Sequence, residues 1–132
     1  MAKLVRGLTI LIIAFMAVTV AYAQQGPRGR WWRDSKVVKQ LRLTDSDIEQ
    51  LEEAWKDSRA RMIKLKSRVE EEQFKLQTLI EKRKLDEKAV KAQNRRLEEA
   101  RTALADERTA FVLEVRKIIG HDRFQLLLEL NE

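Results

Sequence analysis

A dense run of basic residues in the middle of the chain is the clearest candidate for binding chemistry. Six cations fall between residues 56 and 68, where Asp57 is the single acid, and apolar side chains stand among them. Charge speeds the encounter with an unfolded chain, and small apolar patches then retain it. The pattern therefore predicts a client-binding surface, although an ordinary solvated helix face is the alternative. The predicted client-binding residues are Lys56, Arg59, Arg61, Met62, Ile63, Lys64, Lys66 and Arg68.

Residues suited to catalysis or to a metal centre are few. The chain has no cysteine and one histidine, His121, which stands beside Asp122. One imidazole and scattered acids fall short of a metal ligand set. Acidic runs such as 70–72 could do acid–base work, but on long exposed helices such carboxylates pair with nearby Lys or Arg. We therefore expect no enzymatic activity, no cofactor and no metal.

The elements that position these residues are two long helices. Between residues 44 and 120, apolar side chains recur at spacings of three and four, or every seven, which indicates helices that face a partner helix. The first helix should run from about residue 45 to 84, with Thr44 as its N-cap. A tight turn at Leu85-Asp86 should follow, and Gly120 should end the second helix.

The turn predicts an antiparallel pairing in which the numbers of opposed residues total about 170. Leu65 then lies opposite Leu104, and the polar residues Ser58 and Glu72 interrupt the apolar series of the first helix. Short helices should flank the open end, one before residue 42 and one after residue 121. The fold class is all-α: a long antiparallel helical hairpin with short flanking helices.

A hairpin of this kind has a small core. Two helices share one seam, while ordering the backbone costs about 1–2 kcal/mol per residue. A further apolar set lies off the seam, and we expect it to be buried between two chains. The sequence therefore predicts a homodimer, with a monomer closed by the short helices as the alternative. This off-seam set is Phe74, Ile80, Val112 and Ile119.

Residues 1–23 have the pattern of a signal peptide. Lys3 and Arg6 precede an apolar run, and Ala21-Tyr22-Ala23 fits a small-x-small cleavage site. We expect export to the periplasm through a cleaved signal peptide, or, alternatively, an uncleaved anchor. In both cases the working part meets no nucleic acid, despite a formal net charge of +6.

Residues 24–33 form the predicted linker, and residues 34–132 the helical hairpin domain. Glycine and proline in the linker oppose regular structure. Trp31 and Trp32 either contact a membrane or client, or pack back onto the helices. We expect the neighbouring arginines, such as Arg30 and Arg33, to be solvated.

The layout resembles the periplasmic Spy/CpxP family, which also contains heavy-metal-resistance sensors. The residues that carry the resemblance are Leu43-Thr44-Asp45-Ser46-Asp47, which follow the family's L-T-x-x-Q element except that Asp47 replaces Gln. A second such element would be Ile119-Gly120-His121-Asp122-Arg123, without Thr or Gln. We carry over only Leu43 and Thr44, as structural positions. The resemblance implies a cradle-shaped antiparallel dimer and chaperone activity without ATP, or damping of an envelope-stress sensor.

Three hypotheses of function follow. The first is a periplasmic, ATP-independent, holdase-like chaperone of the envelope stress response that binds unfolded or misfolded envelope proteins. The second is a metal- or stress-sensing regulator that binds the periplasmic domain of a membrane sensor kinase. The third is a purely structural coiled coil without clients.

Overall fold

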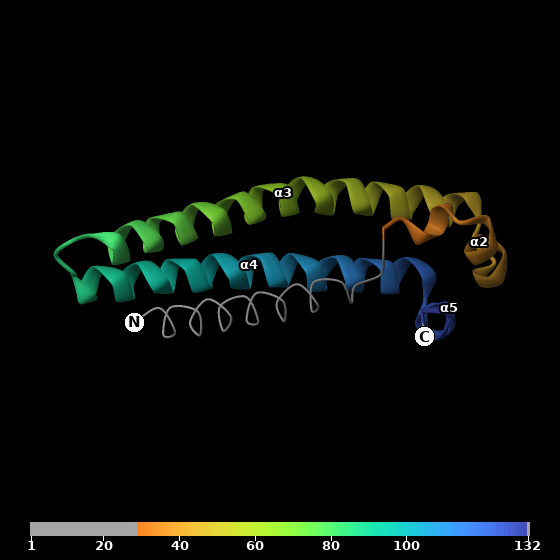
Figure 1. Ribbon diagram of the computed structural model, residues 1–132. Coiled ribbons are helices and arrows are strands. Elements are labelled where there is room, and N and C mark those ends of the chain that lie inside the picture. Colours follow the sequence, from red (N-terminus) through yellow and green to blue (C-terminus); the bar gives the residue numbers. More distant parts are fainter. Residues whose placement is uncertain (1–28, 132) are drawn as a thin grey trace, which may run out of the picture.

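The computed structural model describes residues 29–131, and all of its elements are helical (Figure 1). The predicted signal peptide and the first part of the linker lie outside this range. Two long helices, α3 and α4, run side by side, and the short elements gather at one end, which we call the base. The all-α hairpin is therefore confirmed. The elements are η1 (Trp31–Arg33), α2 (Ser35–Leu41), α3 (Asp45–Glu81), α4 (Glu87–Ile119) and α5 (His121–Leu130).

Side-chain caps fix the starts of the helices. The Asp34 side chain accepts a hydrogen bond from the backbone N–H of Lys36 at the start of α2. Thr44 caps α3, as the sequence predicts, and forms a reciprocal capping box with Asp47. Gly120, with a φ of 81°, ends α4 at the predicted position.

The connection between the long helices is longer than predicted. Helix α3 ends at Glu81, and Lys82 has extended backbone angles, so residues 82–84 belong to a bend and not to the last helical turn. The axes of packed helices lie about 8–10 Å apart. The two residues Leu85 and Asp86 are too few to cross this gap and reverse the chain. Residues 82–84 therefore leave the helix and lengthen the connection.

Two cross-helix contacts define the register. Arg61 Nε lies 2.9 Å from Glu107 Oε1, and Gln93 Nε2 donates to the carbonyl oxygen of Glu72 at 3.0 Å. The numbers of these pairs total 168 and 165, close to the predicted value of about 170. Between them lies the apolar part of the seam on α4, which is formed by Leu97, Ala100 and Leu104.

The main hydrophobic core lies at the base. Its buried members come from every element: Trp32, Leu41, Leu51, Val115, Ile119 and Leu127. Trp32 is 1% exposed, so of the two interpretations of the tryptophan pair, packing holds for this indole. Ile119 was predicted to lie on a second apolar face, and that prediction is wrong. The chain turns back at Gly120, so α5 covers Ile119.

Within residues 29–131, no helix is both long enough and apolar enough to cross a membrane.

Candidate functional surface

The basic segment of α3 divides between two sides of the helix. A separation of three, four or seven residues keeps side chains on the same side. Lys56, Arg59, Ile63 and Lys66 follow this spacing and are all exposed. We call these four residues the outer stripe. Ile63, at its centre, exposes 58% of its surface.

The other predicted client-binding residues lie elsewhere. Arg61, Lys64 and Arg68 are exposed but point to the opposite side of α3. Arg61 is paired with Glu107 of α4 there, at 2.9 Å. Met62 is half-buried because it occupies a seam position. The structure thus brings four of the eight predicted residues together and separates the rest.

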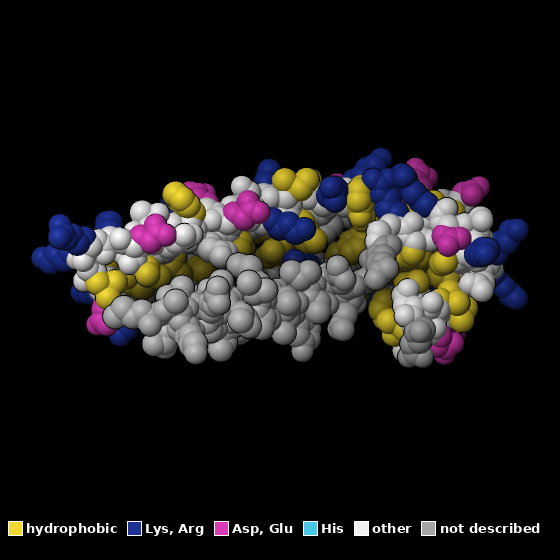
Figure 2. All heavy atoms as spheres, viewed as in Figure 1, with side chains coloured by type: hydrophobic (Ala, Val, Ile, Leu, Met, Phe, Trp, Pro, Cys, Tyr) yellow, Lys and Arg dark blue, Asp and Glu magenta, His cyan; other side chains and the backbone are white. Residues whose placement is uncertain are grey.

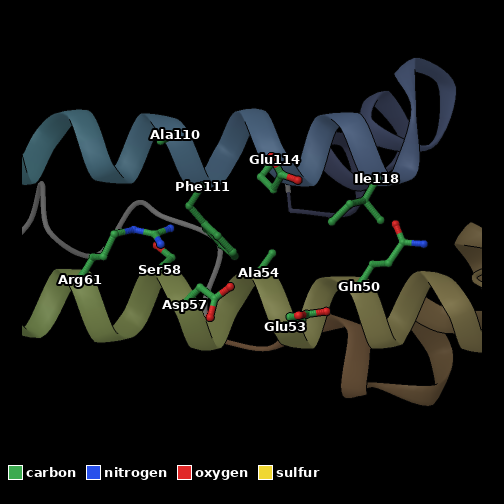
Figure 3. Close-up of a pocket in the computed structure, with 10 residues that line it drawn as sticks. All are labelled: Gln50, Glu53, Ala54, Asp57, Ser58, Arg61, Ala110, Phe111, Glu114 and Ile118. Carbon is green, nitrogen blue, oxygen red and sulfur yellow. The ribbon is translucent and has the colours of Figure 1, made fainter.

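A groove between α3 and α4 opens on the Arg61 side (Figure 3). Its rim carries Glu53 and Asp57 from α3 and Glu114 from α4, and Phe111 points into it. The rim therefore holds more acids than bases, whereas the outer stripe is basic, so the two surfaces differ in the sign of their charge. The lining residues are Gln50, Glu53, Ala54, Asp57, Ser58, Arg61, Ala110, Phe111, Glu114 and Ile118.

At its base end, the outer stripe meets an aromatic side chain. The guanidinium carbons of Arg30 and Arg59 lie 3.6 and 5.3 Å from the centroid of the Trp55 ring. Guanidinium groups over an indole face are attracted by its π electrons. Trp55 therefore holds the segment before η1 and the first part of the stripe together.

Glu52 fixes the same segment from the next turn of α3. Its Oε1 accepts hydrogen bonds from Trp32 Nε1 at 2.8 Å and from Arg33 Nε at 2.6 Å. The bond from Arg33 is the largest cause of the lowered pKa of Glu52, followed by opposing desolvation and then the bond from Trp32. The expectation that the arginines are solvated is wrong for Arg30, which is partly buried against Trp55 and Glu52. Arg33 binds Glu52 as well, but its side chain remains 59% exposed.

The sequence holds a signal for this attachment. Glu52 and Trp55 are three residues apart, so they share one side of α3, and Arg59 continues that side one turn later. An acid and an aromatic on one helix side complement a segment in which two tryptophans stand between two arginines. This pairing was not among the predictions from the sequence, because the linker and this part of α3 are far apart along the chain.

A second exposed apolar side chain follows the outer stripe toward the turn. Phe74 exposes 70% of its surface. It stands eleven residues after Ile63, about three helical turns, so it lies on the same side of α3. Figure 2 shows Lys and Arg atoms gathered over α3, with hydrophobic atoms exposed among them.

A family model described as heavy-metal resistance matches residues 7–125. The chain belongs to the heavy-metal resistance family. This is a Spy/CpxP-like helical family, so the resemblance seen in the sequence is confirmed. No curated protein and no solved structure matches the chain.

The two degenerate L-T-x-x-Q-like elements described in the sequence lie next to each other in the structure. Asp47 and Arg123 are the fifth residues of the two degenerate elements, and their side chains bond at 2.8 Å. Arg123 also donates to the carbonyl oxygen of Ile119 at 2.7 Å. The bond from Arg123 is the main cause that lowers the pKa of Asp47 to about 2. The contact ties α5 to the start of α3.

His121 and Asp122 are exposed at the start of α5, with Nδ1 and Oδ1 2.9 Å apart. Across residues 29–131, no three His, Cys, Asp or Glu side chains are grouped closely enough to hold a metal ion.

Proposed function

We propose that this member of the heavy-metal resistance family is an exported, periplasmic, holdase-like chaperone that works without ATP. It binds unfolded or misfolded envelope proteins on the outer stripe of α3. The proposal includes a homodimer and no catalytic role.

The observation that carries this proposal is the exposure of Ile63 and Phe74 on a basic helix side. Monomeric proteins rarely leave large apolar side chains exposed in a row, and such rows mark interaction sites. Along the stripe, Lys56, Arg59 and Lys66 surround Ile63, and the first acid beyond them on that side, the exposed Glu70, stands four residues after Lys66. Glu52, at its base end, already binds Arg33 and Trp32.

The chemistry suits weak and reversible binding. Long cationic side chains attract acidic stretches of an unfolded chain over about a Debye length, which is roughly 8–10 Å at moderate salt. Each apolar side chain then adds a small contact area. Because each contact is small, a client is released when it folds, since folding buries the apolar surface by which the client was bound.

The test is suppression of aggregation of a chemically denatured client, followed by light scattering without ATP. We expect suppression near equal stoichiometry by the wild type. Replacing Lys56 and Lys66 by Glu should weaken it severalfold, as should Ile63→Ser. The matched control replaces Lys64 and Arg68 by Glu, which changes the net charge equally on the other side of α3.

The control variant should retain most of the activity. Equal loss in both charge variants would show that net charge matters and the outer stripe does not. No suppression by the wild type at severalfold excess would reject the chaperone proposal as a whole.

The second candidate is a metal- or stress-sensing regulator that binds the periplasmic domain of a membrane sensor kinase. The heavy-metal resistance description of the family supports it, and the exposed His121–Asp122 pair offers a partial ligand set. Calorimetric titration with zinc or nickel tests it. Stoichiometric binding that is lost in His121→Ala would favour this function over the first.

A further inference from the structure

The end of the hairpin opposite the base carries a cluster of cations. Residues 82–84, which read Lys-Arg-Lys, lie in the bend between α3 and α4 and are all exposed. Lys88 and Lys91 follow on the exposed first turns of α4. Figure 2 shows the Lys and Arg atoms that gather at this end of the molecule, which Figure 1 identifies as the turn.

Two large apolar side chains flank the cations. Ile80 exposes 54% of its surface in the last turn of α3, and Leu85 exposes 56% in the bend. Neither belongs to the core at the base. An exposed leucine next to three cations at the end of a long rod is a costly arrangement in water, because its apolar surface stays hydrated.

Two of the three acids at this end have local roles, and the third, Glu87, lies in the first turn of α4. Glu81 accepts a hydrogen bond from Gln77 at 2.9 Å, and Asp86 caps α4 by accepting from the N–H of Ala89 at 3.1 Å. None of the ion pairs found within residues 29–131 involves positions 82–84. These cations are therefore free to meet an external anion.

We propose that this tip, residues 80–91, binds the anionic headgroup surface of a phospholipid bilayer. Cations attract the negative surface potential of such a bilayer, and exposed apolar side chains then enter the interfacial region. Lys and Arg side chains suit this arrangement because their aliphatic stems lie along the apolar region while the charge remains in water.

The geometry favours a bilayer over a small anion. A bound phosphate needs donors that converge on one point, whereas these cations surround an exposed bend with apolar side chains between them. A planar array of headgroups can meet all of them at once. The site is separate from the outer stripe, which lies on α3 nearer the base.

The experiment is co-sedimentation of the purified protein with vesicles of phosphatidylethanolamine and phosphatidylglycerol, and with neutral phosphatidylcholine vesicles. One variant replaces Lys82, Arg83 and Lys84 by Gln, and a second is Leu85→Ser. Each cation near an anionic surface contributes roughly fivefold to binding, so the triple variant should bind about a hundredfold more weakly. High salt should weaken wild-type binding in the same direction.

The matched control replaces Lys64, Lys66 and Arg68 by Gln, which removes three charges from the middle of α3. It should lose much less binding than the tip variant, and Leu85→Ser should lose binding without any change of charge. Equal loss in both triple variants would overturn the proposal, since net charge alone would then explain the binding. Absence of selective binding to the anionic vesicles would overturn it as well. The proposal would also fail if the tip variant bound anionic vesicles as well as the wild type does and had lost only the ability to bind an acidic protein.

Discussion

At the scale of single residues, Trp32 links the first described segment to the helices. Its indole is 1% exposed and its Nε1 donates to Glu52. Trp32→Ala removes both this hydrogen bond and a large buried apolar surface, and such truncations cost about 3–5 kcal/mol. Urea unfolding followed by helical circular dichroism should therefore show a large loss of stability.

The control for this prediction is Trp31→Ala. Trp31 is only partly buried against the core and stacks edge-on to Trp32, with ring centroids 5.3 Å apart. Its truncation should cost less than that of Trp32. Equal, small effects of both substitutions would contradict the docked arrangement of η1.

The pair of Asp47 and Arg123 makes stability depend on acid pH. The pKa of Asp47 falls from 3.8 to about 2 on folding, mainly through the bond from Arg123. Because the pKa is lower in the folded state, the ionised carboxylate stabilises the fold fully when the pH is above the pKa of the unfolded chain. This contribution is lost as pH falls from about 4 toward 2. In Asp47→Asn, the free energy of unfolding should therefore fall by about 1–2 kcal/mol less than in the wild type over this pH range.

Urea unfolding at several pH values measures the effect. Asp45→Asn changes an exposed acid in the same helical turn and should keep the wild-type dependence on pH. An unchanged acid dependence in Asp47→Asn would show that the bond to Arg123 does not stabilise the fold.

At the scale of elements, a polar pair interrupts the seam between α3 and α4. Gln93 is 5% exposed and donates to both the backbone and the side chain of Glu72. The bond from Gln93 is the first cause of the lowered pKa of Glu72. Buried polar groups of this kind fix register at some cost in stability.

Replacing both Glu72 and Gln93 by Leu should therefore raise the urea midpoint, because apolar packing replaces desolvated polar groups. The matched control replaces the exposed pair Gln77 and Glu81, which share a hydrogen bond on α3, by Leu. That change should leave the midpoint nearly the same. A lower midpoint in the seam variant would mean that the polar pair stabilises the hairpin on balance.

The helices and their caps could be predicted because the information is local. Spacings of three and four residues determine helix faces, and Thr44, Asp86 and Gly120 are residue types that start or end helices. The end of α3 could not be predicted in this way. It depends on how many residues the chain needs to cross between the two axes, and no residue type marks that distance at Lys82.

The candidate surface was harder to predict than the fold. A window of sequence groups residues 56–68, but a helix distributes them around its axis, so only four share the outer stripe. The attachment of Arg30 and Arg33 depends on Glu52, nineteen residues or more along the chain. Contacts of that separation are set by tertiary packing and leave little trace in local patterns.

At the scale of the whole molecule, exposed apolar residues on α4 and α5 support the proposed homodimer. Of the off-seam set expected between two chains, this proposal keeps only Val112 in the interface, because Phe74 is assigned to client binding and Ile80 to the tip. Val112, Leu113, Leu128 and Leu130 expose between 38% and 55% of their surfaces. We expect light scattering after size exclusion to give twice the mass of one chain. Leu113→Glu combined with Leu128→Glu should shift the protein to the monomer, since a buried charge is costly.

Ile63→Glu, on the outer stripe, is the control for this prediction and should leave the dimer intact. A monomeric wild type at micromolar concentration would contradict the dimer, and loss of the dimer in Ile63→Glu would place the interface on the stripe instead.

The most direct measurement places a photoreactive side chain at Ser67 and, separately, at Thr102. Both positions are exposed. Ser67 stands one turn after Ile63 on the same side of α3, whereas Thr102 lies on α4 beside Glu98 and Glu99. If the outer stripe holds unfolded clients, illumination should cross-link a denatured client strongly at Ser67 and weakly at Thr102. Equal cross-linking at the two positions, or cross-linking at Thr102 alone, would contradict the assignment of client binding to the outer stripe.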